Sequence, residues 1–285
     1  MKIMLCLLLL SIVGAKASGN NTYGIPTYLD QNTNTIETYN PVLTNPIRSH
    51  AHGDAFANYL KSNLNANFPN IAISRTDRRD ASVTYTAIIN DASINNYEMV
   101  FFGGHGFSDK KSTTGNVAGF VTYEHGSISP IDRTYGGWTR WVFMDFCQFM
   151  RNHNASFYSH MFAGLHAVFG YESDMWYYII SYNCYCFGGC CSHHRSESKY
   201  ENFAAKWAKV NGIGLWDAWS QANQEIQYNQ GGVGNAPAVV YNYYAGWQGL
   251  YFDGSQERIN TIFNGDVPVS SLRHKFVSYG TPTYN

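Results

Sequence analysis

The chain has 285 residues, of which 45% are hydrophobic and only 14% are charged, against a usual charged share of about 25%. Aromatic residues reach 16%, with 22 tyrosines, so the composition excludes intrinsic disorder as well as collagen-like and coiled-coil chains. The formal net charge of −1 favours neither a nucleic-acid-binding surface nor an acidic tail. The remaining class is an α/β or β-rich globular protein. Its unusual feature is that four of the six cysteines lie within eight residues.

Residues 1–17 have the pattern of a secretory signal. A lysine follows the first methionine, residues 3–13 form an apolar run, and 15–17 give a small-x-small cleavage site. The apolar run is shorter than the roughly 20 residues that span a bilayer, and no later stretch is apolar enough to anchor the chain. We therefore expect an exported mature protein, residues 18–285, without a membrane span.

Export would also make two short sequons readable as glycosylation sites. They stand at Asn20, followed by Asn and Thr, and at Asn154, followed by Ala and Ser. We expect glycans at both asparagines if the host glycosylates.

The hydrophobic patterning predicts strands and helices that alternate along the chain. Residues 18–49 look irregular, with at most an edge strand. Apolar spacing indicates helices over 52–64, 203–210 and 215–228, while the stretch 146–163 permits a helix. Compact apolar runs and turn residues indicate strands over 71–74, 83–89, 98–102, 141–144, 167–171 and 237–241, a surface hairpin at 117–123, and short β pieces at the C-terminus. The alternation predicts one α/β domain with a mainly parallel sheet and helices on both faces.

Reactive side chains follow two of the predicted buried strands. The strand 98–102 leads into Gly103-Gly104-His105-Gly106, and the strand 141–144 leads into Asp145-Phe146-Cys147-Gln148. Sites in open parallel sheets form outside the carboxyl ends of the strands. We therefore expect these two segments to meet at one edge of the sheet.

The residue types at these strand ends suit nucleophilic catalysis. An ordinary thiol has a pKa near 8.5 and is only a few per cent ionised at neutral pH, so we expect the imidazole of His105 to activate Cys147 and to protonate the leaving amine. The missing side chain of Gly106 would let its N–H approach the substrate oxyanion, with the Cys147 N–H as the second donor. Two other His-Gly pairs, at His52 and His125, stay open as sources of the histidine.

These two segments resemble those of the clan of cysteine peptidases that contains caspases, metacaspases, legumain, clostripain and gingipains. The separation of His105 and Cys147, 42 residues, is close to the spacing of about 50 in caspases. The further stretch 162–171 resembles a family of secreted caspase-like proteins. The resemblance implies a three-layer caspase-like sandwich, a Cys147–His105 dyad acting on a peptide or protein substrate, and no cofactor.

The resemblance also implies a role for Asp145. Metacaspases carry an aspartate two residues before the nucleophile and prefer Arg or Lys, which implies that Asp145 binds a basic substrate side chain. Phe146 and Gln148 depart from the smaller or polar neighbours found in metacaspases. An alternative is that Asp145 caps the following helix or pairs with a nearby arginine, Arg140 or Arg151. A further histidine, His166, is expected to be a packing residue.

The clustered cysteines allow two interpretations. In an oxidising compartment they would form two disulfides, and together with His193 and His194 they could instead bind Zn²⁺. We favour disulfides and expect no metal; the residues concerned are Cys184, Cys186, Cys190 and Cys191. If these four pair with each other, Cys147 is the odd cysteine of the mature chain, which supports a reactive thiol.

Three functions therefore follow from the sequence. The first is a secreted cysteine endopeptidase that uses Cys147 and His105 and cleaves after Arg or Lys. The second is a catalytically silent caspase-like module that binds a protein or glycan partner, and a site occluded at Phe146 would favour it. The third is a zinc enzyme that uses the cysteine cluster. None of the three involves a nucleic acid.

Overall fold

The computed structural model describes fourteen stretches of the chain. They are 23–29, 47–69, 73–79, 83–104, 106–108, 118–121, 127–151, 154–173, 179–181, 193–195, 198–228, 236–245, 251–259 and 271–277. The predicted signal at 1–17 and the sequon at Asn20 lie outside the described residues.

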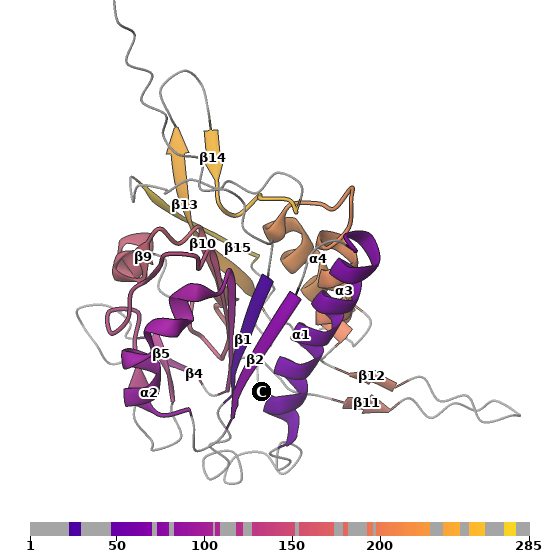
Figure 1. The fold of residues 1–285 in the computed structure, drawn as a ribbon, viewed down its shortest axis with the longest axis horizontal. Helices are drawn as coiled ribbons and strands as arrows, with labels where there is room; N and C mark the ends of the chain where they lie inside the picture. The colour runs from indigo at the N-terminus through magenta and orange to yellow at the C-terminus, as the bar shows by residue number, and fades with distance from the viewer. Residues whose placement is uncertain are drawn as a thin grey trace, which may run out of the picture.

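A large, mainly parallel sheet forms the centre of the molecule (Figure 1). In spatial order its strands are β2 (Ile73–Arg79), β1 (Tyr23–Leu29), β3 (Met99–Gly103), β8 (Trp141–Asp145), β10 (Ala167–Tyr171), β13 (Pro237–Ala245) and β14 (Tyr251–Asp253), with β15 (Leu272–Phe276) also paired to β13. The pairings from β2 to β10 are parallel, whereas β13 is antiparallel to β10, β14 and β15. Strands covered on both faces are nearly continuous apolar runs, and β3, β8 and β10 are buried at every residue, including the terminal Asp145 of β8.

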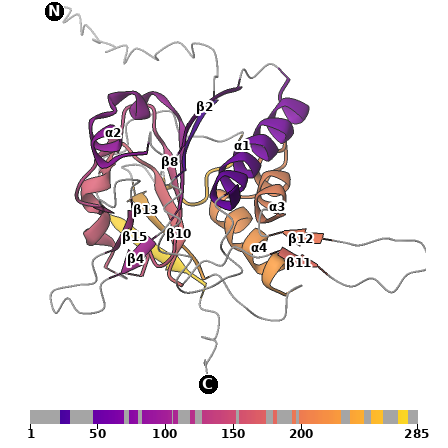
Figure 2. The same ribbon diagram turned by 90° about the horizontal axis from the view of Figure 1, so that it is seen from below.

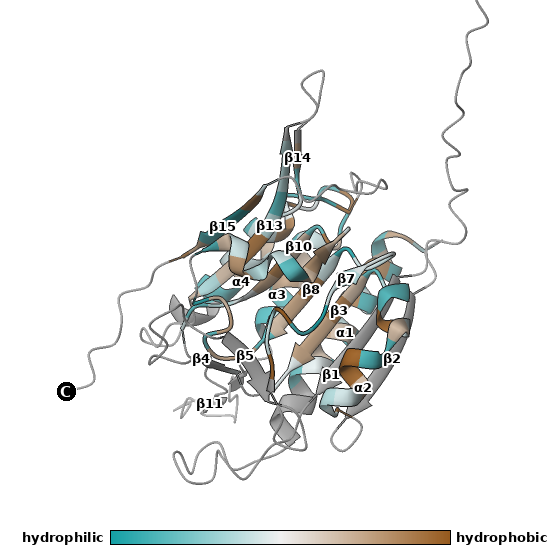
Figure 3. Ribbon diagram, turned by 90° about the vertical axis from the view of Figure 1, so that its left-hand side faces the viewer, coloured by the Kyte–Doolittle hydropathy of each residue, from teal (hydrophilic) through white to brown (hydrophobic). Residues whose placement is uncertain are grey.

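Helices lie on both sides of this sheet, so the α/β fold has three layers (Figure 2). One face packs against α1 (Ile47–Asn67), α3 (Ser198–Trp207) and α4 (Leu215–Tyr228). The opposite face is covered by shorter elements, namely α2 (Tyr85–Asn90) and the 3-10 helices η4 (Ala92–Asn96) and η5 (Ala155–Met161). The central strands between these layers are mostly hydrophobic (Figure 3). In the described part of the chain, no helix is both long and apolar enough to cross a membrane.

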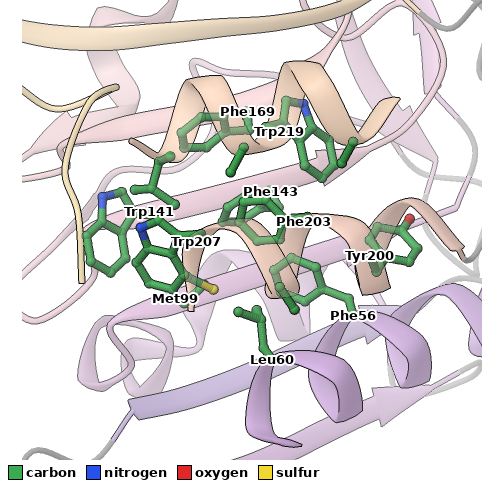
Figure 4. Packing of buried hydrophobic residues seen from close by; sticks show 14 of the residues in the cluster. Phe56, Leu60, Met99, Trp141, Phe143, Phe169, Tyr200, Phe203, Trp207 and Trp219 are labelled. Carbon is green, nitrogen blue, oxygen red and sulfur yellow. The ribbon is translucent and has the colours of Figure 1, made fainter. Parts of the chain in front are cut away.

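Aromatic side chains fill the core between the sheet and the three long helices (Figure 4). Phe143 on β8 lies at its centre, stacked on Phe169 of β10 with ring centroids 4.7 Å apart. The rings of Phe56, Phe203 and Trp219 surround it from α1, α3 and α4 at 4.9, 5.5 and 5.3 Å. One residue of β8 thus joins all three helices to the sheet.

Smaller β elements lie beside the central sheet. β4 (Gly106–Ser108), β5 (Ala118–Val121) and β6 (Ser127–Ile128) form an antiparallel sheet, so the predicted hairpin at 117–123 contributes its middle strand. β7 (Tyr135–Gly136) pairs with β9 (Phe162–Ala163) in parallel, and β11 (Ile179–Ser181) pairs with β12 (His193–Arg195) in antiparallel orientation. The clustered cysteines fall between β11 and β12 in the sequence and lie outside the described residues.

Most predicted strands and helices are confirmed, although β2 covers Ile73–Arg79 where a strand was expected over 71–74, and three predictions differ from the structure. β1 lies inside the sheet, between β2 and β3, where at most an edge strand was expected. The predicted strand 83–89 is largely helix α2, because the side chain of Thr84 accepts a hydrogen bond from the Ala87 N–H and caps a helical turn. The stretch 146–163 contains a turn and the 3-10 helix η5 in place of an α-helix.

A partly buried acid, Glu98, which directly precedes β3, gives the fold a measurable pH dependence. Burial raises the pKa of Glu98 from 4.5 to about 7, although the guanidinium of Arg140, 3.6 Å away, acts in the opposite direction. The folded state therefore holds this proton more tightly than the unfolded state, so stability falls as the pH rises from about 4.5 through about 7.

We expect Glu98→Gln to remove this loss and to stabilise the protein above pH 7 by on the order of 2 kcal/mol. Urea unfolding of both proteins at pH 5 and pH 8 measures the effect. A gain of the same size at both pH values would contradict the assignment to Glu98.

Candidate active site

Cys147 lies at the start of a tight turn that follows β8. The turn is tied to the end of β10 and to the residues that follow it, because the N–H of Met150 donates to the carbonyl of Tyr171 and the N–H of Gln148 donates to that of Ser173, both at 2.9 Å. Gln148 has φ of 57°, the left-handed region that residues other than glycine rarely adopt. Such strained positions occur preferentially at functional sites. Cys147 is partly buried and is the only cysteine in the described part of the chain.

The backbone of Gly106 lies directly against this turn. A Cβ at Gly106 would stand 2.1 Å from the carbonyl oxygen of Cys147 and 2.6 Å from the Cβ of Phe146. Only glycine allows the start of β4 to come so close. Glycine was expected here for access to a substrate oxyanion, and the structure shows a separate requirement for it, which is the close contact with the backbone of Cys147. The roles of the Gly106 and Cys147 N–H groups as oxyanion donors stay predictions.

Paired residues of β3 and β8 have the same sequence separation as the two residues of the predicted dyad, His105 and Cys147. Each residue of β3, from Met99 to Gly103, pairs with the residue of β8 that lies 42 positions later in the chain. Cys147 also stands 42 positions after His105. His105 itself lies outside the described residues, although Gly104 and Gly106 on either side of it are described.

Asp145, two residues before Cys147, is fully buried and holds side chains from two helices. Its Oδ1 accepts a hydrogen bond from the Lys199 ammonium of α3 at 2.8 Å, and its Oδ2 lies 2.8 Å from Nδ1 of His52 on α1. The hydroxyl of Tyr200 is 2.9 Å from the same Nδ1. The sequence predicted that the carboxylate needs a cation, and in this structure Lys199 supplies it.

Lys199 is enclosed as well as paired. Its ammonium lies 4.9 Å from the ring centre of Tyr171 and 4.8 Å from that of Tyr200, and the residue is 1% exposed. Burial alone would raise the pKa of Asp145, but the neighbouring charges of Lys199 and His52 and their hydrogen bonds outweigh it and hold the pKa well below its usual range. Asp145 is therefore a buried anion with built-in partners.

This arrangement corrects the role expected for Asp145. A substrate side chain does not reach the carboxyl in this structure, because Asp145 is 0% exposed and both of its oxygens are engaged. The alternative arginine partners are also wrong, since Arg140 faces Glu98 at 3.6 Å and Arg151 donates to the Gln148 side chain at 2.9 Å.

Sequence reasoning missed Lys199, because the predicted helix started at 203. A usable signal was present: Lys199 shares one helical stripe with the apolar residues Tyr200, Phe203 and Trp207, all of which are buried. A lysine on the buried face of a helix requires an acidic partner.

Two other expectations at this site can be compared with the structure. Phe146 does not cover Cys147, because its side chain packs into the core on the opposite face of the sheet, with its ring 6.4 Å from that of Phe149. His166 is a buried packing residue, as expected, with Nδ1 2.7 Å from the carboxylate of Glu257.

The remaining predicted site residues are only partly described. Asn154 is exposed and its side chain accepts hydrogen bonds from the N–H and hydroxyl of Ser156, at 3.1 and 2.7 Å. His125 lies outside the described residues, as do Cys184, Cys186, Cys190 and Cys191. Within the described ranges, no three His, Cys, Asp or Glu side chains are grouped to hold a metal ion.

Comparisons with known proteins add little to this geometry. No protein-family model matches the chain, and no curated protein matches it. Among solved structures, the chain is similar to the crystal structure of the Drosophila initiator caspase Dronc, with a TM-score of 0.37 and 10% sequence identity. The match covers 79% of this chain and 85% of that one. At such a TM-score the likeness assigns no activity, so the function has to be inferred from the site.

Proposed function

We propose that this protein is an exported cysteine endopeptidase in which Cys147 is the nucleophile and His105 is the general acid and base. Cys147 Sγ would attack the scissile carbonyl carbon and form an acyl-enzyme, while the imidazole passes the thiol proton to the leaving amine as the C–N bond breaks. Water would then hydrolyse the thioester and return the thiol. Export rests on residues 1–17, whose sequence has the signal pattern.

The observation that carries this proposal is the contact between the two strand ends. Gly106, which follows His105 in the chain, packs against the backbone of Cys147, and the β3–β8 register has the spacing of the His105–Cys147 pair. The strained Gln148 and the partial burial of Cys147 also fit a nucleophile held at the end of a strand.

The preference for Arg or Lys stays a prediction with less support than the peptidase activity. Its expected determinant, Asp145, already has a cation from its own chain. We therefore propose peptides as the substrate class, with the residue before the scissile bond to be read from a panel of reporters that carry Arg, Lys, Asp or Leu there.

The experiment uses the full chain expressed in a secreting eukaryotic host and collected from the medium, so that it also tests export. We expect turnover of at least one reporter and its loss, by a factor of about 10³ or more, in Cys147→Ala. Activity that persists in Cys147→Ala would refute the mechanism, and protein retained in the cell would refute export.

A thiol probe separates this proposal from the silent binding module. The peptidase predicts that iodoacetamide labels native Cys147 faster than the same cysteine in the unfolded chain, because a catalytic thiol is activated. A Cys147 that is labelled only after denaturation would favour the silent module.

A further inference from the structure

Asp145 and Cys147 are close neighbours in the chain at the end of β8, where Asp145 is fully buried and Cys147 is partly accessible. They are two residues apart at the end of β8, and Cys147 packs against the same core cluster that contains Tyr171 and Tyr200. These are the two tyrosines whose rings enclose the Lys199 ammonium. A change in charge at Asp145 or Lys199 therefore acts on the thiol at short range and through protein with little water.

We propose that Lys199 and Asp145 are positioning residues of the Cys147 site, and that their balanced charges set how readily the thiol loses its proton. The pair itself has no net charge when both members are ionised, and His52 adds a positive charge beside it when its ring is protonated, so the thiolate of Cys147 does not meet a buried anion in excess. The inference rests on the proposed role of Cys147 as a nucleophile. It also explains why a carboxylate placed beside the nucleophile need not repel the thiolate.

The charged and titratable groups around the pair come from four elements. Asp145 lies on β8, His52 on α1, Lys199 and Tyr200 on α3, and Tyr171 on β10. The neighbouring helix α4 contributes the uncharged Asn223, which accepts a hydrogen bond from the Tyr171 hydroxyl at 3.1 Å. Apart from the pair itself, His52 is the group in this set that can take up a proton near neutral pH.

Substitutions of the two members of the pair are expected to shift the pKa of the Cys147 thiol in opposite directions. Lys199→Met removes a positive charge and leaves the Asp145 anion in excess, which disfavours the thiolate. Asp145→Asn removes the anion and leaves the Lys199 ammonium in excess, which favours the thiolate. A merely structural role would loosen the site in the same way in both variants.

The experiment is the pH dependence of Cys147 alkylation by iodoacetamide in the full-length protein. We expect the pH midpoint of alkylation to rise by about one unit in Lys199→Met and to fall by about one unit in Asp145→Asn. Protonation of His52 in Lys199→Met would replace part of the lost positive charge and make that rise smaller. The double variant should return close to the parent. If Lys199→Met does not fold, Lys199→Gln takes its place, because its amide still donates to Asp145 without a charge.

Two controls separate electrostatics from loss of stability. Lys206→Met makes the same substitution on the same helix, but its partner Glu225 is 45% exposed, so the midpoint should not move. Glu257→Gln disturbs the buried contact between Glu257 and Trp141 at the other end of β8, where the Glu257 carboxylate accepts a hydrogen bond from the Trp141 indole N–H at 2.9 Å. It should lower stability without shifting the midpoint.

Folded variants whose midpoints equal that of the parent, or move in the same direction, would overturn the inference. The outcomes also distinguish it from the proposed function. Opposite shifts without turnover of any reporter would support the charge pair and refute the peptidase. Turnover with unshifted midpoints would refute the charge pair alone, and a native thiol that never reacts would refute both.

Discussion

Phe143→Ala is expected to lower the free energy of unfolding by about 3–5 kcal/mol, the usual cost of removing a buried phenylalanine ring. The ring is fully buried and contacts aromatic rings from α1, α3, α4 and β10. Its removal leaves a cavity between the sheet and all three long helices. Urea unfolding followed by tryptophan fluorescence measures the loss.

Phe143→Leu provides the matched control, since leucine keeps most of the apolar volume and should cost less than half as much as alanine. The activity should be affected as well, because Phe143 precedes Asp145 by two residues on the same face of β8. Equal stability losses for alanine and leucine would show that packing at this position does not hold the layers together.

Gly106→Ala is expected to lower peptidase activity by about 100-fold or more, because it displaces the chain beside the nucleophile. The added methyl group would overlap the carbonyl oxygen of Cys147, at 2.1 Å, and the Cβ of Phe146, at 2.6 Å. The nearest contact is with backbone, which no rotamer change can move away. Turnover of the best reporter, measured beside the rate of Cys147 alkylation, gives the effect on both chemistry and thiol access.

Gly164→Ala is a matched control for this variant. A Cβ at Gly164 would stand 3.9 Å from the nearest backbone atom, the Cα of Gly136, which is an ordinary van der Waals distance. The φ of Gly164, 104°, would nevertheless strain any residue with a side chain. Gly164→Ala should lower stability without the large loss of activity. Full activity in Gly106→Ala would contradict the close packing of β4 against the Cys147 turn.

The sequence was sufficient to predict the elements that carry the site, because these elements have strong local signals. The apolar runs that became β3 and β8 are bounded by glycine or by polar residues, and their burial on both faces leaves little choice of structure. α4 begins and ends at the predicted residues, 215 and 228. The run 83–89 misled because its β-branched residues favour a strand, whereas the Thr84 cap and the burial of Ile88 produce a helix.

The partners of Asp145 could not be found from local pattern. His52 lies 93 residues before it and Lys199 lies 54 residues after it, and neither is brought close by strand pairing. The arginines that seemed natural partners are near in sequence and lie elsewhere. The sequence therefore predicted that the carboxylate needs a cation, while the packing of α1 and α3 on the sheet decides which cation it meets.

The interior position of β1 has a consequence for how the protein can assemble. The strand pairs with β2 at residues 50 positions later and with β3 at residues 74 positions later, as in Tyr23 with Ile73 and Thr27 with Phe101. Among the described strands, the first to leave the ribosome or a translocation pore thus has no partner until β2 follows 50 residues later, and its second partner, β3, follows 74 residues later, after about a quarter of the chain. Sheets closed by such distant pairings form slowly. Loss of this strand would divide the sheet between β2 and β3, where an edge strand would only have shortened it.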